Sequence, residues 1–82
     1  MAIILKVNGS TEPLTDLSLE SMQKAVGGYI EYVPLPDGRI MYCDEEGKLK
    51  SKPINPEATR IFDNPYDVVV GDVIIMEESE DA

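Results

Sequence analysis

Turn signals divide this chain of 82 residues into segments that leave room only for short strands and helices. The signals are Asn8-Gly9, Gly27-Gly28, Pro36-Asp37-Gly38, Asn55-Pro56 and Gly71-Asp72. Because the connections are short, neighbouring strands should pair antiparallel. The sequence therefore predicts one α+β domain over residues 1–76, with a small, mainly antiparallel sheet of about five strands and two short helices. The acidic tail, 77–82, is expected to be disordered.

Apolar alternation and β-branched residues locate the strands. Residues 2–7 should form a first strand, and residues 10–14 could return beside it as an edge strand, because Pro13 tolerates only an edge. Two aromatic and β-branched runs around the Pro36-Asp37-Gly38 turn predict a hairpin. The remaining strand-like segments are the exposed run 48–52 and the buried runs 68–70 and 73–76.

Capping residues locate the helices. Ser18 is a good N-cap for a helix over 19–26 that ends at Gly27, where glycine can adopt the left-handed conformation. Asn55 followed by Pro56 predicts a second helix over 56–62. Both helices are expected to pack on one face of the sheet.

The charge and composition exclude several classes of function. Sixteen acidic and seven basic residues give a net charge of -9, which disfavours direct binding to nucleic acid or to an anionic membrane. Histidine is absent, so the usual general base is missing. The single cysteine excludes an internal disulfide, and no segment approaches the roughly 20 apolar residues of a membrane span. We expect a cytoplasmic, non-enzymatic protein without a cofactor, which associates as a homo-oligomer because its core is small.

A run of basic residues is the first candidate for a ligand site. Lys48, Lys50 and Lys52 lie on one side of an extended segment, just before the helix start at Asn55. Together with Asn55, Thr59 and Arg60 they could surround a phosphate near the free N–H groups of that helix. The alternative is that the lysines protect an exposed sheet edge from aggregation.

Three further sets of residues have both a functional and a purely structural interpretation. Tyrosines at sheet positions can stack on nucleobases, and Tyr29 and Tyr32 are the candidates, although packing is an ordinary role for these residues and for Tyr42 and Tyr66. The acids Asp37, Asp44, Glu45 and Glu46 could hold a divalent cation, but they lack EF-hand spacing and fit solvated turns. Cys43 fits a packed strand position, and Glu31 is an acid among apolar neighbours that is either outward-facing or functional.

The segment from Val26 to Thr59, together with Gly71-Asp72, resembles a family of small acidic proteins. The shared pattern includes Val26 to Glu31, the turn from Asp44 to Lys48, and Asn55 with Ala58-Thr59. This family is encoded mainly by bacteriophages, plasmids and other mobile elements, and its domain has no known function. The resemblance implies a phage or mobile-element origin and no particular chemistry.

Two functions from different classes follow from these observations. The first is a non-enzymatic binder that sequesters a small phosphorylated nucleotide signal of bacterial antiviral defence, with the lysines and tyrosines as its contacts. The second is an acidic interaction protein, or a mimic of DNA, that blocks a host defence enzyme. A hydrolase of a signalling nucleotide, built from lysine and carboxylate groups, stays open as a third possibility.

Overall fold

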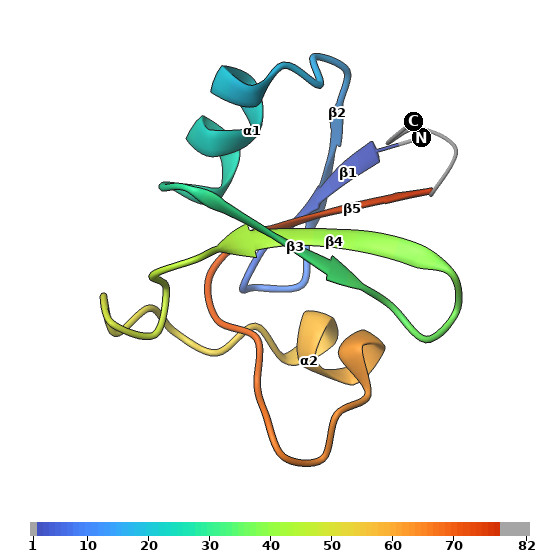
Figure 1. The fold of residues 1–82 in the computed structure, drawn as a ribbon, viewed down its shortest axis with the longest axis vertical. Coiled ribbons are helices and arrows are strands. Elements are labelled where there is room, and N and C mark those ends of the chain that lie inside the picture. Colours follow the sequence, from blue (N-terminus) through green and yellow to red (C-terminus); the bar gives the residue numbers. More distant parts are fainter. Residues whose placement is uncertain (1, 78–82) are drawn as a thin grey trace.

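A computed structural model describes residues 2–77, which form one five-stranded antiparallel sheet and two helices (Figure 1). The strands lie in the order β2-β1-β5-β4-β3. Their bounds are β1 Ala2–Leu5, β2 Thr11–Leu14, β3 Ile30–Pro34, β4 Arg39–Asp44 and β5 Val73–Glu77, and the helices are α1 Leu19–Val26 and α2 Pro56–Phe62. The predicted α+β class is confirmed.

Local signals set the ends of both helices. The Ser18 side chain accepts a hydrogen bond from the Ser21 amide at 3.2 Å, and Gly27 ends α1 with φ of 83°. Asn55 caps α2 by accepting from the Ala58 amide at 3.1 Å, and Pro56 occupies the first turn, where a missing N–H is harmless. The bounds predicted for these helices are confirmed.

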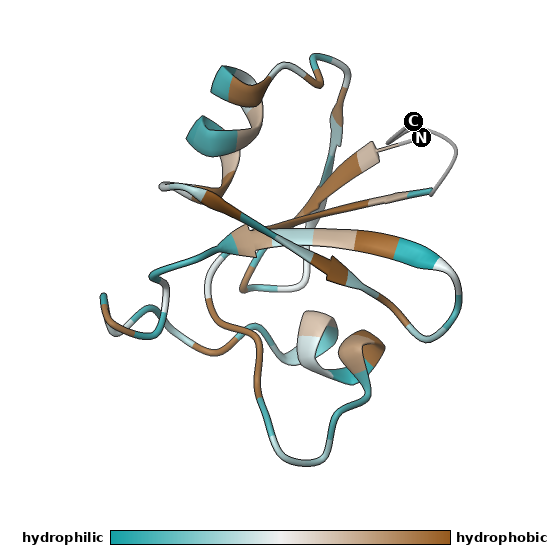
Figure 2. Cartoon of the chain, viewed as in Figure 1, coloured by the Kyte–Doolittle hydropathy of each residue, from teal (hydrophilic) through white to brown (hydrophobic). Residues whose placement is uncertain are grey.

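The two helices lie on opposite faces of the sheet, so the expectation that they share one face was wrong (Figure 1). Side chains alternate along β4: Ile40 and Tyr42 pack with Val26 of α1, whereas Met41 packs with Ala58 of α2. We call these sides the α1 face and the α2 face. Because both faces are covered, the central strands are apolar on both sides, and Figure 2 shows hydrophobic residues concentrated in β1 and β5.

Two segments expected to be strands are not. Residues 48–51 form turns, in which the Lys50 amide donates to the Glu46 carbonyl at 3.0 Å and the Lys52 amide to the Gly47 carbonyl at 3.1 Å. The segment 68–70 contributes only one isolated bridge, between Val70 and Ile54. At the C-terminal end, Glu77 belongs to β5 opposite Arg39, and the rest of the predicted tail, 78–82, lies outside the described residues.

Each edge strand carries a proline at a position that faces outward. The hydrogen bond from the Leu35 amide to the Arg39 carbonyl, at 2.9 Å, sets the alternation in β3, so the backbone groups of Tyr32 and Pro34 point to the open edge. The bond from the Lys6 amide to the Ser10 carbonyl, also 2.9 Å, places Pro13 of β2 in the same way. Pro13 therefore lies in an edge strand, as predicted.

Candidate functional site

A pocket of about 180 Å³ opens on the α2 face, where α2 leaves the sheet uncovered. Its floor is made by two neighbouring cross-strand pairs of the β3–β4 hairpin, Glu31 with Cys43 and Val33 with Met41, and the exposed side chain of Glu31 forms part of the rim. Its walls come from the turn after β4, from the end of α2 and from the loop before β5. The wall residues are Asp44, Glu45, Lys48, Leu49, Phe62, Asp67, Val68, Val69 and Val70.

Gly47 allows the turn after β4 to form one side of the pocket. A Cβ atom at this position would lie 2.9 Å from Val70 Cγ2, closer than side chains normally approach. The Gly47 amide also donates to the Asp44 carbonyl at 3.0 Å, which closes the turn. Two apolar side chains then remain on the pocket rim, Leu49 at 83% exposed and Val68 at 40%.

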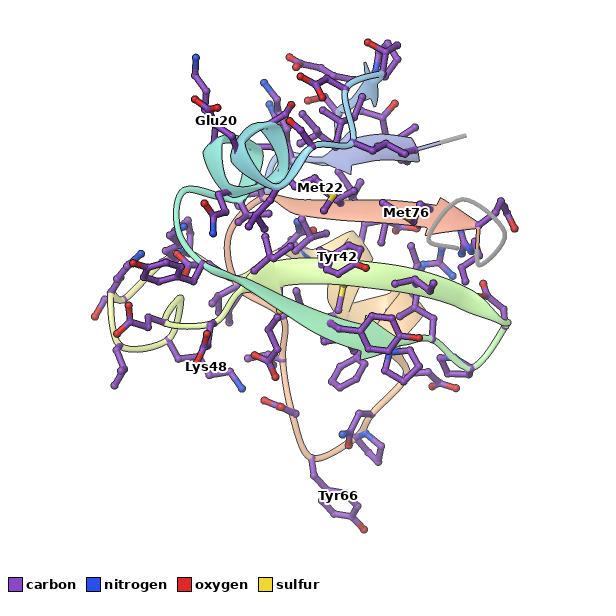
Figure 3. All side chains as sticks on the ribbon, turned by 45° about the horizontal axis from the view of Figure 1, so that its top comes forward. Glu20, Met22, Tyr42, Lys48, Tyr66 and Met76 are labelled. Carbon is purple, nitrogen blue, oxygen red and sulfur yellow. The ribbon has the colours of Figure 1, made fainter. Side chains whose placement is uncertain are left out.

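The charges around the pocket are mostly negative. Lys48 forms an ion pair with Asp67 across the mouth, and Figure 3 shows its side chain directed toward the loop that ends in β5. Within residues 2–77, no lysine or arginine pairs with Glu31 or Glu45, both of which are exposed. The pocket therefore has two uncompensated carboxylates at its rim.

The Cys43 thiol reports the environment inside the pocket. Burial raises its pKa, and the negative charges of Glu31, Asp44 and Asp67 add to this effect, so the pKa reaches about 11. Lys48 acts in the opposite direction but does not outweigh them. A thiol with this pKa is protonated at neutral pH and is a poor nucleophile.

Asp44 shows how this protein satisfies an acid on the other side of β4. Its side chain is 1% exposed and pairs with Lys50 at 2.9 Å and Lys52 at 2.7 Å. Burial alone would raise its pKa, but hydrogen bonds from Lys52, Lys50 and the Glu46 amide outweigh this and lower the pKa to about 2.

The same two lysines also bind the C-terminal end of α1. Lys52 donates to the Val26 carbonyl at 2.6 Å, and Lys50 donates to the Gly27 carbonyl at 3.2 Å. Cations stabilise this end of a helix because its carbonyl groups are free. Lys52 also lines a broad, open groove of about 450 Å³ beside α1. Both ammonium groups thus have structural partners.

The structure does not bring the predicted phosphate ligands together. Lys48 lines the pocket, whereas Lys50 and Lys52 are directed at α1 and not at the start of α2. Arg60 pairs with Glu57 on the surface, and Thr59 exchanges hydrogen bonds with the backbone of Val69.

Asn55, also predicted as a ligand-binding residue, is fully buried. Its side-chain amide donates to the Leu5 carbonyl at 3.0 Å and the Gly71 carbonyl at 2.9 Å while its oxygen caps α2. All of these contacts are internal, so Asn55 joins α2 to β1 and to the segment before β5.

The tyrosines are dispersed over the molecule. Tyr29 and Tyr32 are 68% and 51% exposed, and Tyr32 contacts the ring of buried Tyr42 edge-on with centroids 5.9 Å apart. Tyr66 is 95% exposed and projects from the loop after α2, whereas Tyr42 lies near Met22 and Met76 on the α1 face (Figure 3). None of the four lines the pocket.

Sequence reasoning missed most of the pocket. Glu31 and Cys43 were each considered, but their pairing across the hairpin was not, although the turn at Pro36-Asp37-Gly38 determines which residues face each other. The contributions of Phe62 and Val68 depend on where α2 and the following loop pack, and no local pattern encodes this. Within the described residues, no group of three or more acidic or cysteine side chains is placed to hold a metal ion.

Comparison with known proteins gives a family and no activity. No helix in the described part of the chain has the length and apolar character needed to cross a membrane. No match was found among curated proteins or among solved structures. The model of a domain of unknown function, DUF3846, matches residues 1–82. The chain therefore belongs to the DUF3846 family.

Proposed function

We propose that this protein is a non-enzymatic interaction domain that binds a basic segment of a partner protein on its pocket face. The observation that supports this most is the pocket itself, which combines a negative environment with exposed apolar side chains at its rim. Exposed apolar residues beside a concave site are typical of interaction surfaces. The net charge of -9 adds long-range attraction for a basic partner.

The size and charge of the pocket support sequestration of a nucleotide less well than binding of a basic segment. Pockets for drug-sized ligands measure about 300–1,000 Å³, and this pocket measures about 180 Å³. The groove beside α1 is larger, about 450 Å³, but it is open, and its Lys52 is paired with Asp44. The lysines that would bind phosphate are paired with Asp44 and Asp67, and the field at the pocket repels anions. Nucleotide binding is therefore the competing outcome of the test below.

The biological setting is part of the proposal and is supported by the resemblance to proteins of mobile elements. We propose a phage or mobile-element origin and action in the cytoplasm of a bacterial host, with a host defence protein as the partner. Absence of an enzymatic activity and association into a homo-oligomer also stay predictions.

The test is a titration of ¹⁵N-labelled protein with short synthetic peptides, followed by amide NMR. A peptide of alternating leucine and lysine should shift the amides of Val33, Cys43 and Leu49. Matched peptides of leucine with glutamate, and of glycine with lysine, should bind much more weakly, because each lacks one of the two features. Linear and cyclic nucleotides should produce no shifts.

Variants locate the binding surface. Leu49→Asp and Val68→Asp place a charge on the rim and should abolish binding of the leucine–lysine peptide without unfolding the protein, because both side chains are exposed. Leu19→Asp is the control, since Leu19 is 58% exposed on α1, across the sheet. Unchanged binding in both rim variants, or saturable nucleotide binding, would overturn the proposal.

A further inference from the structure

We infer that the pocket accepts a single aliphatic cation, the side chain of a lysine, as the anchor of the bound segment. This inference rests on the proposed function and specifies what enters the site. It assigns a recognition role to Glu31 and Glu45 at the rim, and to Val33, Met41 and Phe62 in the interior.

The volume sets the size of the occupant. At about 30 Å³ for each water molecule in the liquid, the roughly 180 Å³ of the pocket would hold about six waters. This is enough room for one long side chain and too little for a base with its sugar and phosphate. A single anchoring residue in a pocket is a common arrangement at protein interfaces.

The charges around the pocket indicate that the group bound in it should carry a positive charge. The only lysine in the pocket wall, Lys48, is paired with Asp67, which leaves Glu31 and Glu45 without a cation among the described residues. Asp44 adds little attraction for a further cation, because Lys50 and Lys52 already neutralise it from the α1 side. A cation entering the mouth would therefore complete the charge balance at this rim.

The apolar surfaces explain why the cation should be carried on a hydrocarbon chain. Val33 and Met41 form neighbouring positions of the floor, and Phe62 stands beside them at the end of α2. A lysine buries its methylene stem along apolar surface while its ammonium group stays near water and charge. The apolar floor of the pocket would contact the methylene stem of the lysine, and the acidic rim would contact its ammonium group.

The experiment uses small probes that separate charge from hydrocarbon. We would titrate the labelled protein with n-butylammonium and follow the amides of Glu31, Val33, Met41 and Cys43. n-Butanol and n-butyrate have the same chain without the positive charge, and n-butylguanidinium replaces the ammonium with the group of arginine. We expect saturable shifts with butylammonium, weaker ones with butylguanidinium, and none with butyrate.

Glu31→Gln should weaken butylammonium binding about threefold, as expected for one exposed ion pair, and Glu31→Gln with Glu45→Gln about tenfold. Glu20→Gln, which removes the same charge from the exposed side of α1, is the control and should leave the affinity unchanged. Equal binding of butanol and butylammonium, or an unchanged affinity in the double variant, would overturn the inference.

The two proposals fail in different ways. If Leu49→Asp abolishes binding of the leucine–lysine peptide while butylammonium does not bind, the interaction surface is right and the lysine anchor is wrong. If butylammonium binds and Glu31→Gln weakens it, but both rim variants keep the peptide affinity, the anchor is right and the docking surface is wrong.

Discussion

The two faces of the sheet differ in how completely the chain covers them. On the α1 face, Met22 of α1 packs with Tyr42 and Met76, and Asp44, the one buried acid among residues 2–77, is paired with two lysines. On the α2 face, the short α2 covers Met41 and Ile75 but leaves the Glu31 end of the hairpin open. On the first face the cations beside the buried acid are already paired, whereas the second face keeps a pocket with two carboxylates that are unpaired within the described chain, the feature on which the proposed binding depends.

The strongest test of this difference removes the same amount of hydrocarbon from each side. Ile74→Ala, at a fully buried position of the α1 face, should lower the free energy of unfolding by about 3 kcal/mol. Leu49→Ala on the pocket rim should change it by less than about 0.5 kcal/mol, since Leu49 is mostly exposed. Urea denaturation measures both. Similar losses in the two variants would show that the pocket rim also supports the fold.

The second prediction concerns the accessibility of the pocket to reagents. Cys43 should react with iodoacetamide in the folded protein, but at pH 7.5 about a hundredfold more slowly than a thiol of ordinary pKa, because its pKa is about 11 instead of 9.0. The rate should rise about tenfold for each pH unit. Butylammonium should slow the reaction further. A fast reaction at neutral pH would show that burial and the neighbouring carboxylates do not raise the pKa of Cys43.

The third prediction concerns the buried acid on the α1 side. Asp44 titrates at about 2 in the folded state and ordinarily near 3.8, so its ion pairs stabilise the fold above pH 4. This contribution, about 2 kcal/mol, should be lost as the pH falls from 4 toward 2. Asp44→Asn should remove that part of the pH dependence and leave the part due to the exposed acids. Identical acid profiles for both proteins would contradict the assignment.

The smallest predicted effect is the difference in stability between alanine substitutions at two glycines, Gly28 on the α1 side of β4 and Gly47 on the α2 side. A Cβ at Gly28 would lie 2.6 Å from Lys50 Nζ and 2.8 Å from an Asp44 oxygen, so Gly28→Ala should cost about 1 kcal/mol of stability. Gly47→Ala meets Val70, whose side chain can shift into the pocket, and should cost less. Thermal unfolding measures which variant loses more stability. A larger loss of stability for Gly47→Ala than for Gly28→Ala would show that the pocket wall is rigid.

The sequence predicted the elements of the fold well because their signals are local. Ser18, Gly27, Asn55 and Pro56 act on their own helix ends, and Pro36-Asp37-Gly38 acts on its own hairpin. The placement of both helices on one face was wrong although a signal was present. Strands such as β5 are apolar at consecutive positions, which indicates that both faces of the sheet are buried.

The candidate site was less predictable because its charges are set by distant partners. Lys52 reaches the Val26 carbonyl over 26 positions, and Lys48 reaches Asp67 over 19. The alternation of lysines resembles an exposed strand, yet in the folded chain it brings two of them to one buried acid. Only the tertiary fold distinguishes a free basic run from one whose charges are already used.

The prolines at the two sheet edges limit how copies of this protein can join. Pro34 and Pro13 each remove a donor from the outer side of an edge strand, so an incoming strand would find an incomplete ladder. Continuous growth of the sheet from one molecule to the next, as in a fibril, is therefore disfavoured at both ends. We therefore expect any assembly of this chain to use side-chain contacts of its faces and loops in preference to strand addition at these two edges.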